Sequence, residues 1–265
     1  KRQIMNGIDG GELISPTLTF EAINQFASKT MKTNVVRVPM TKEIGIDLKT
    51  TGQMVNSKTN MVYLCNPNNP TGVIMNPKEL EVFCKETSKK SIVFVDEAYH
   101  EYVMDKQYRS MVSLVNEGYD VLISRTASKV HGLAGLRVGY AISTPNIIKR
   151  LNSYMNGSLN VVGLRGAIAS YKDKRFQKFS IEKNNEGRSI VTDYLDKKGI
   201  EYLDSQTNFI FIKTGIDIKK FQPAMEKHKV LVGRPFPPYT DWCRLSIAKP
   251  EEMESFNKGF NKELG

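Results

Sequence analysis

The chain has 265 residues, of which 40% are hydrophobic and 25% are charged, a composition typical of a soluble globular protein with one large or two modest domains. No apolar stretch is long enough to span a membrane, so we expect no membrane partner. The net charge of +10 would suit nucleic-acid binding, but the basic residues are dispersed and are not interleaved with stacking aromatic residues. We therefore expect a lysine-rich solvated surface that attracts anionic substrates, and no nucleic-acid partner.

The first two-thirds of the chain alternates short apolar runs with helical segments. The runs predict strands at Asn34–Val38, Met61–Cys65, Ile92–Val95, Val121–Ile123 and Val138–Ile142. After the second run, Asn76 and Pro77 predict the start of a helix, with Glu79 placed for a capping box and with Val82 and Phe83 on the apolar side. This alternation predicts an α/β fold with a mainly parallel sheet that helices cover on both faces.

The last third of the chain has a different pattern. Residues 161–198 predict long charged helices without strands. Beyond them, strands at residues 208–212 and 244–247 flank a helix at residues 218–229, and Pro250 opens a last helix with Met253, Phe256 and Phe260 near helical spacing. We therefore expect a larger domain at residues 1–165 and a smaller α+β domain at residues 166–265.

The sequence also bears on redox state and location. The opening residues, Lys1 to Gly7, show no signal-peptide pattern, although a targeting segment upstream of Lys1 would not be visible. The few cysteines and histidines predict neither a disulfide framework nor a metal site: Cys65, Cys84, Cys243, His100, His131 and His228. We interpret the cysteines as reduced core residues, in keeping with a cytoplasmic protein.

Polar clusters follow three of the predicted strands: residues 66–72, 96–99 and 124–129. Ligands of parallel sheets bind beyond the carboxyl ends of the strands, so we expect Asn69, Asp96 and Lys129 to converge there. With Tyr99, these residues supply an amide, a carboxylate, an amine and a phenol. That set suits pyridoxal 5'-phosphate (PLP), where a lysine forms the Schiff base and an acid partners the pyridine nitrogen.

The order and spacing of five features resemble the class I and II aminotransferases of PLP fold type I: Asn-Pro-Thr-Gly at 69–72, Asp-x-x-Tyr at 96–99, Ser-Arg-Thr-Ala-Ser-Lys at 124–129, Gly-Leu-Ala-Gly-x-Arg at 132–137 and a late Arg244. Within them, the chain most resembles the histidinol-phosphate aminotransferase group. The resemblance covers nearly the whole chain from Gly11 onward. It implies a PLP-binding large domain, a smaller C-terminal domain and a homodimer with active sites near the interface.

The resemblance assigns cofactor roles to the residues at the strand ends. Lys129 is the expected Schiff-base lysine, and it would shuttle the proton between the substrate Cα and the cofactor. Asp96 would keep the pyridine nitrogen protonated, while Tyr99 and Asn69 would donate to the ring's 3′ oxygen. Each also has a plain structural interpretation: a surface lysine, a cap or turn aspartate, a half-buried tyrosine and a turn asparagine.

Thr126, Ser128 and Arg137 are the candidates for the cofactor phosphate, because hydroxyl donors and a guanidinium match phosphate oxygens. Ser128 can also be only a cap or turn residue. Family members are longer and start earlier, with a Gly-rich turn that holds the phosphate at a helix start. The sequence as written therefore lacks part of the expected phosphate site and the N-terminal arm.

The substrate candidates lie late in the chain. Arg244 would clamp a carboxylate or phosphate through paired hydrogen bonds, and its plain alternative is a surface arginine on an edge strand. Arg234 and Asn208 are weaker candidates, while Tyr239 and Trp242 either line the entrance or pack. Family members also stack an aromatic residue on the cofactor ring. Counting from Pro16 gives Leu18 for this position, and a shifted alignment gives Phe20, which we select.

The predicted function is PLP-dependent transfer of an amino group from L-histidinol phosphate to 2-oxoglutarate. One arginine site would then bind phosphate in one half-reaction and carboxylate in the other. Aromatic aminotransferases and a related PLP decarboxylase or lyase are alternatives within the resemblance. A non-catalytic PLP-binding regulatory domain and an inactive fragment are alternatives of a different class.

Overall fold

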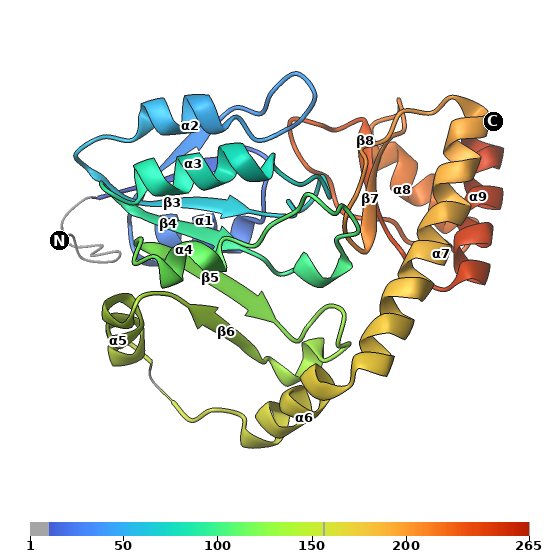
Figure 1. Ribbon diagram of the computed structural model, residues 1–265. Helices are drawn as coiled ribbons and strands as arrows, with labels where there is room; N and C mark the ends of the chain where they lie inside the picture. The colour runs from blue at the N-terminus through green and yellow to red at the C-terminus, as the bar shows by residue number, and fades with distance from the viewer. Residues whose placement is uncertain (1–10, 156, 265) are drawn as a thin grey trace.

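The computed structural model describes residues 11–155 and 157–264, so the opening segment Lys1 to Gly7 lies outside the described residues. Its larger sheet has the strand order β2-β1-β3-β4-β5-β6 (Figure 1). Strands β1 to β5 are parallel, and β6 runs antiparallel to β5. The strands are β1 (Glu12–Pro16), β2 (Asn34–Val38), β3 (Thr59–Cys65), β4 (Ile92–Asp96), β5 (Val121–Thr126) and β6 (Gly139–Ile142). The predicted mainly parallel sheet is confirmed, and β1 is a strand that the sequence patterns did not predict.

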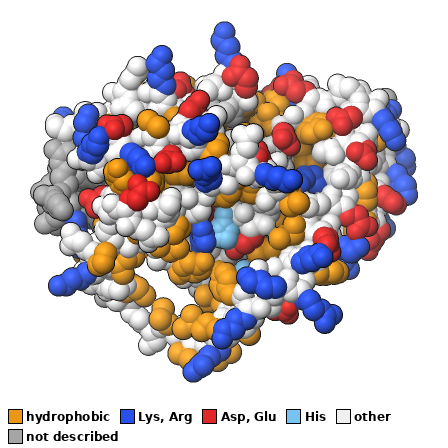
Figure 2. All heavy atoms as spheres, viewed as in Figure 1, with side chains coloured by type: hydrophobic (Ala, Val, Ile, Leu, Met, Phe, Trp, Pro, Cys, Tyr) orange, Lys and Arg blue, Asp and Glu red, His pale blue; other side chains and the backbone are white. Residues whose placement is uncertain are grey.

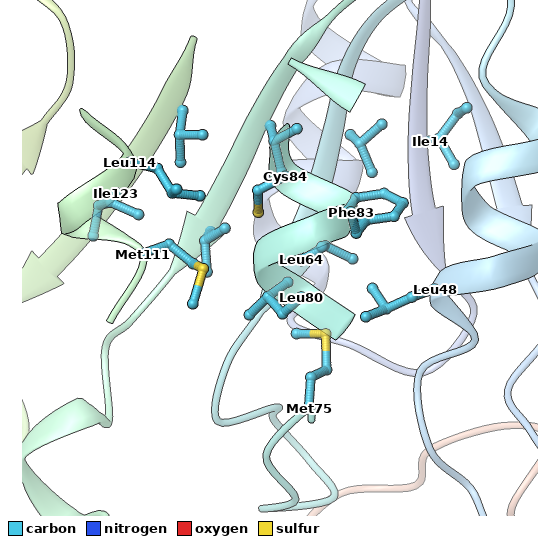
Figure 3. Close-up of a cluster of buried hydrophobic side chains, with 14 of the residues drawn as sticks. Ile14, Leu48, Leu64, Met75, Leu80, Phe83, Cys84, Met111, Leu114 and Ile123 are labelled. Atoms are coloured by element: carbon cyan, nitrogen blue, oxygen red, sulfur yellow. The ribbon is translucent and has the colours of Figure 1, made fainter. Parts of the chain in front are cut away.

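Helices cover both faces of this sheet because its central strands are apolar on both sides. In β3, Val62 and Leu64 pack into a core beneath α2 (Leu48–Met54), α3 (Pro77–Thr87) and α4 (Val112–Asn116). Figure 3 shows this core, with Leu80, Phe83 and Cys84 of α3 facing the sheet. Met61 and Tyr63 point the other way, into a core that includes Ala27 and Ile147. On that face lie α1 (Glu21–Gln25), the π-helical turn η1 (Phe26–Thr30) and α5 (Pro145–Ser153).

Helix α3 begins as its sequence predicts. The side chain of Asn76 accepts hydrogen bonds from the backbone N–H groups of Lys78 and Glu79, and Pro77 occupies the first turn. Phe83 is buried, but Val82 is 63% exposed. The assignment of Val82 to the apolar side was therefore wrong, because the buried stripe of α3 runs through Leu80, Phe83, Cys84 and Thr87 and Val82 lies outside it.

The C-terminal part has its own core around a second sheet. Strands β7 (Phe209–Lys213) and β8 (Trp242–Ser246) pair antiparallel, and helix α8 (Ile218–Glu226) lies between them in sequence. The last helix, α9 (Pro250–Leu264), buries Met253, Phe256 and Phe260 against this sheet, which confirms the predicted helical spacing.

Two helices connect the sheets. Helix α6 (Val161–Lys172) ends at Asp173, whose carboxylate accepts the backbone N–H of Phe176 and so caps the start of α7 (Lys174–Lys198). Figure 1 shows α7 running from α6 to the side of α9. The predicted boundary between residues 165 and 166 falls within α6 and stays a prediction.

Charge and hydropathy follow the same plan. Figure 2 shows Lys and Arg side chains scattered among Asp and Glu over the visible face, without one basic stripe. In the described part of the chain, no helix is long and apolar enough to cross a membrane. Cys65, Cys84 and Cys243 are free and buried, as expected for core residues.

Candidate active site

The structure brings together polar residues from the ends of three strands and from β8. Asp96 is the last residue of β4, while Asn69 and Lys129 lie in the loops that follow β3 and β5. Nη1 of Arg244 donates to Oδ1 of Asn69 at 2.8 Å. The amine of Lys129 lies 4.9 Å from the centre of the Tyr99 ring. Residues that are remote in sequence therefore form one polar group between the two sheets.

The loop after β3 is held by its own asparagines. Oδ1 of Asn66 accepts the backbone N–H of Met75 at 2.9 Å, and Nδ2 of Asn68 donates to the backbone oxygen of Leu18 at 3.0 Å. These bonds leave Asn69, which is 8% exposed, to meet Arg244. The segment is thus a structural turn that also places an amide in the group.

Two hydroxyl groups fix the carboxylate of Asp96. Tyr63 donates to Oδ2 at 3.1 Å, and Ser124 donates to Oδ1 at 2.8 Å. Burial raises the pKa of Asp96, and both hydrogen bonds oppose that shift because they favour the ionised form. We did not assign a role to Tyr63 or Ser124 from the sequence. The sequence did carry a signal for Ser124, which is a polar residue at the end of an apolar run. In the structure, Ser124 is the register partner of Asp96 on the neighbouring strand.

The neighbouring acid, Glu97, has a different environment, because successive residues of a strand point to opposite faces. It is 1% exposed and accepts a hydrogen bond from Nη2 of Arg125 at 2.8 Å. Ser110 and the backbone N–H of Met111 also donate to it. These contacts give Glu97 a structural role.

Lys129 lies in a tight turn packed against the site. The backbone N–H of Gly132 donates to the backbone oxygen of Lys129 at 2.9 Å, and Val130 is buried against Tyr99 and Tyr102. Burial lowers the pKa of the Lys129 amine, the charge of Arg244 lowers it further, and Asp96 opposes the shift. The neutral, nucleophilic amine is thereby favoured.

A cavity of about 760 Å³ reaches Lys129 from the side of α7. Asn208, a predicted substrate residue, lines the same cavity, together with Phe176 and Phe179 of α7. The structure therefore places Asn208 and Lys129 on one space.

The candidates for the cofactor phosphate lie at the end of β5 and just beyond it. Thr126 donates from its hydroxyl to Oγ of Ser128 at 2.8 Å and accepts the backbone N–H of Ser128 at 3.1 Å. Arg137 is exposed, has a left-handed backbone with φ of 56°, and donates to the backbone oxygen of Ala134 at 2.9 Å. The charge of Arg137 also contributes to the lowered pKa of Lys129. The roles of these residues remain predictions.

Arg234 and Arg244 flank one aromatic ring. The guanidinium carbons of Arg234 and Arg244 lie 4.2 Å and 5.7 Å from the centre of the Phe236 ring. Burial lowers the pKa of Arg244, and Tyr99 opposes this while Arg234 adds to it. Nε of Arg244 is buried and has no hydrogen-bond partner among the described residues. The pair therefore offers positive charge and an unused donor to an anion.

The two candidates for the ring-stacking position lie in different surroundings. Phe20 immediately precedes α1 and is 42% exposed, whereas Leu18 is buried and packs in a cluster with Phe236. The choice of Phe20 stays a prediction. Trp242 and Tyr239 were expected either to line the entrance or to pack. Trp242 packs: its ring stacks on that of Phe211, with 5.1 Å between the ring centres. Tyr239 lies half-buried beside the same cluster.

The family is settled by sequence comparison. Residues 3–258 match the model of the family described as aminotransferase class I and II. The chain belongs to this family. The amine of Lys129, the carboxylate of Asp96 and the two arginines are therefore part of an aminotransferase chain.

Curated relatives within the family carry a more specific name. Histidinol-phosphate aminotransferase 2 of Hydrogenovibrio crunogenus is 34% identical over 259 residues, which cover 96% of this chain and 69% of the relative. Histidinol-phosphate aminotransferase of Brevibacillus brevis is 37% identical over 215 residues, which cover 79% of this chain and 57% of the relative. The chain thus spans between 57% and 69% of the length of these two relatives.

Solved structures of aminotransferases share the fold. A protein from Erwinia carotovora atroseptica, provisionally named histidinol-phosphate aminotransferase, is 32% identical and gives a TM-score of 0.91 over 98% of this chain and 77% of its own. Histidinol-phosphate aminotransferase from Sinorhizobium meliloti, solved in complex with pyridoxal-5'-phosphate, gives a TM-score of 0.85 at 23% identity over 98% of this chain and 74% of its own. The α/β fold with a PLP fold type I large domain is confirmed.

Proposed function

We propose that this protein is a PLP-dependent aminotransferase that moves an amino group from L-histidinol phosphate to 2-oxoglutarate. The observation that carries the proposal is the contact of Arg244 with Asn69 beside the Lys129 amine, because it joins an anion-binding cation to a candidate nucleophile. The names of the curated relatives support the choice of donor.

The residues present fit the cofactor. The ionised form of Asp96 is held by two hydroxyl donors, as partnership with a protonated pyridine nitrogen requires. Lys129, with a lowered pKa, would hold the aldehyde carbon. Tyr99 and Asn69 would donate to the 3′ oxygen, and Thr126, Ser128 and Arg137 would contribute donors to the phosphate. When bound, the cofactor supplies an electron sink for the substrate Cα.

This chain's own residues would do the rest. The freed amine of Lys129 would take a proton from the substrate Cα and return it during transfer, and its lowered pKa increases the share of the neutral amine that can act as the base. Arg244, through Nε and its remaining N–H groups, would bind the donor's phosphate and then the acceptor's carboxylate. Arg234, across the Phe236 ring, would add charge for the more highly charged phosphate. Asn208 would contact the substrate from the cavity wall.

Cofactor titration and covalent trapping test the first part of the proposal. The protein is titrated with PLP, the visible absorbance band is followed, and borohydride is added before peptide mapping. We expect a single modified peptide containing Lys129. Modification spread over several surface lysines would contradict the assignment.

Paired-substrate assays test the reaction. We expect glutamate to form from 2-oxoglutarate with L-histidinol phosphate, and more slowly with aromatic amino acids. Faster turnover with an aromatic amino acid would show that the donor is an aromatic amino acid and not L-histidinol phosphate. Release of carbon dioxide would identify a decarboxylase.

We also propose that the protein forms a homodimer. Apolar side chains are exposed before and along α6, at Tyr154, Leu159, Val161 and Val162, the last being 80% exposed. Figure 2 shows hydrophobic side chains gathered on this lower part of the molecule. A contiguous patch of this kind is typical of a protein interface. Sedimentation at working concentration should give twice the monomer mass, and a monomer would contradict the proposal.

A further inference from the structure

The backbone on either side of Arg137 is tied to a different element. On the C-terminal side, the backbone oxygen of Val138 accepts the backbone N–H of Ala127 at 3.0 Å. On the N-terminal side, the backbone oxygen of Leu136 accepts a hydrogen bond from Nδ2 of Asn160 at 3.0 Å. Arg137 therefore lies between one anchor just after β5 and another at the start of α6.

Arg137 depends on such anchors because its backbone is left-handed. Its φ is 56° and its ψ is 47°, directly after the 3-10 turn η3 (Ala134–Leu136). This conformation is unfavourable for a residue with a Cβ atom, and it persists only where the surroundings hold it. The backbone N–H of Arg137 reaches the backbone oxygen of Ala134 only at 3.4 Å, which is long for a hydrogen bond. Contacts outside the turn therefore have to help to hold it.

Asn160 makes two contacts with one amide group. Its Oδ1 accepts the backbone N–H of Gly163 at 2.9 Å and so caps α6. Its Nδ2 is left free by the cap, and it donates to the backbone oxygen of Leu136. The reverse orientation of the amide would lose both bonds, so the two contacts fix the side chain. Capping needs only the oxygen, and the nitrogen adds a link to a second segment.

Helix α6 has room for the turn because two glycines face it. A Cβ at Gly163 would lie 2.6 Å from Nδ2 of Asn160 and 3.2 Å from Cβ of Leu136. Three residues further on, a Cβ at Gly166 would lie 3.5 Å from Cδ1 of Leu136. The side chain of Leu136 therefore packs against the glycines of α6, and this contact brings its backbone oxygen within reach of Asn160.

We propose that Asn160 is a positioning residue for Arg137. Through the backbone oxygen of Leu136, it holds the backbone from which the Arg137 side chain reaches the cofactor phosphate. This role rests on the proposed function, in which Arg137 and Thr126 both contribute donors to that phosphate. The other anchor, the backbone oxygen of Val138, lies 3.2 Å from the Thr126 hydroxyl. Asn160 thus fixes the guanidinium relative to the hydroxyl without touching the cofactor.

Asn160→Ser separates the two contacts of the amide. Serine caps a helix about as well as asparagine, so α6 keeps its cap, while the donor to Leu136 is removed. Asn76→Ser is the matched control. The oxygen of Asn76 caps α3, and its Nδ2 has no hydrogen-bond partner in the part of the chain that the structure describes. The control therefore changes a cap in the same way but breaks no link between segments.

The first experiment compares two ligands by absorbance titration: PLP, and pyridoxal, which lacks the phosphate. Asn160→Ser should raise the Kd for PLP about two- to tenfold, the range expected for one hydrogen bond, and leave the Kd for pyridoxal unchanged. Asn76→Ser should change neither Kd. An equal rise for both ligands would mean a general structural role and would overturn the proposal, as would an unchanged Kd for PLP.

A double variant tests whether Asn160 acts through Arg137. Arg137→Gln removes the guanidinium, so the position of the turn no longer matters for the phosphate. Adding Asn160→Ser to Arg137→Gln should therefore leave the Kd for PLP within about twofold of that of Arg137→Gln alone. A further rise as large as that caused by Asn160→Ser in the unmodified protein would show that Asn160 acts elsewhere, and would overturn the proposal.

Hydrogen exchange tests the fastening of the turn in the protein without cofactor. The peptide covering residues 133–138 contains the amides of Leu136 and Arg137, which bond within the turn. Their exchange should be about two- to tenfold faster in Asn160→Ser than in the unmodified protein, and unchanged in Asn76→Ser. Equal exchange in all three proteins would overturn the proposal. If PLP failed to bind the unmodified protein, the proposed function would fall, and exchange would still decide whether Asn160 fastens the turn.

Discussion

Arg244 in β8 donates from Nη1 to Oδ1 of Asn69, at 2.8 Å, across a sequence separation of 175 residues. This bond ties the small sheet to the loop that follows β3 of the large one. It occupies one guanidinium nitrogen and leaves Nε of Arg244 buried without a partner among the described residues. Arg244 therefore has a structural contact and spare donors for a substrate anion.

Arg244→Ala should impair both half-reactions, because amine donor and 2-oxo acid each lose a charge-assisted pair. Truncation of such a pair in a desolvated site typically costs about 2–5 kcal/mol, so binding should weaken by orders of magnitude. Arg244→Lys should recover only part, since an ammonium keeps the charge and loses the paired geometry. Single-turnover kinetics on each half-reaction measure this. Impairment toward the 2-oxo acid alone would show that the donor's anion is held elsewhere, with Arg234 the next residue to test.

Lys129→Ala should abolish transamination and leave the fold intact, because the nucleophile is lost and only a small void forms. The cofactor should still bind without a covalent bond, through Asp96 and Arg137. Steady-state turnover and far-UV circular dichroism check the two parts. Near-normal turnover in the purified variant would show that Lys129 is not the nucleophile.

The pKa of Lys129 should respond to its two charged neighbours in opposite directions. Arg244→Gln should raise the pKa, because Arg244 lowers it, and Asp96→Asn should lower it further, because Asp96 opposes the downward shift. Competitive acylation of the cofactor-free protein across pH, read by mass spectrometry, gives the pH at which the amine becomes reactive. The exposed Lys183, paired with Glu186, serves as an internal reference whose profile should not change. Shifts of the same sign in both variants would contradict this account.

Tyr63→Phe should weaken PLP binding by removing a donor from the Asp96 carboxylate. A hydrogen bond to a charged group contributes about 1.5–3 kcal/mol, so the Kd for PLP should rise on the order of tenfold or more. Tyr202→Phe is the matched control, because Tyr202 donates to Asp196 at 2.9 Å on an exposed surface. Absorbance titration compares the two variants. An equal Kd in both would remove Tyr63 from the site.

Two glycines in neighbouring helices should respond to alanine with opposite signs. A Cβ at Gly187 in α7 would lie 2.8 Å from the backbone oxygen of Ala248, so Gly187→Ala should destabilise by about 1–3 kcal/mol. A Cβ at Gly166 in α6 would meet Leu136 at 3.5 Å, an ordinary contact, so Gly166→Ala should stabilise by up to about 1 kcal/mol through helix propensity. Urea unfolding of both variants measures the difference, and destabilisation by both would contradict the packing argument.

The elements of the fold were predictable where the pattern was long or apolar on both sides. Strands β3 to β5 and helix α9 follow from buried runs and from the spacing of Met253, Phe256 and Phe260. Strand β1 was missed because its apolar run is short: only Leu13 and Ile14 stand between Glu12 and Ser15. Val82 was misplaced because the buried stripe of α3 includes Phe83 and Cys84 and leaves Val82 exposed.

The site was partly predictable for a related reason. The ends of parallel strands converge, so the vicinity of Asn69, Asp96 and Lys129 follows from local sequence. The contact of Arg244 with Asn69 does not, because it depends on how the small sheet packs against the large one. The support of Asp96 by Tyr63 depends on the register between strands. Such contacts between elements leave no periodic signal in the sequence.

Because the two sheets are separate in sequence, the residues of the candidate site are synthesised in a fixed order during translation. Every strand of the large sheet, together with Asn69, Asp96, Tyr99 and Lys129, is synthesised by residue 142, whereas Arg244 follows about a hundred residues later. At ribosomal rates of about 5–20 residues per second, the interval is roughly 5–20 s. The residues proposed for the cofactor are thus complete in the nascent chain before β8 adds the arginine proposed for the substrate.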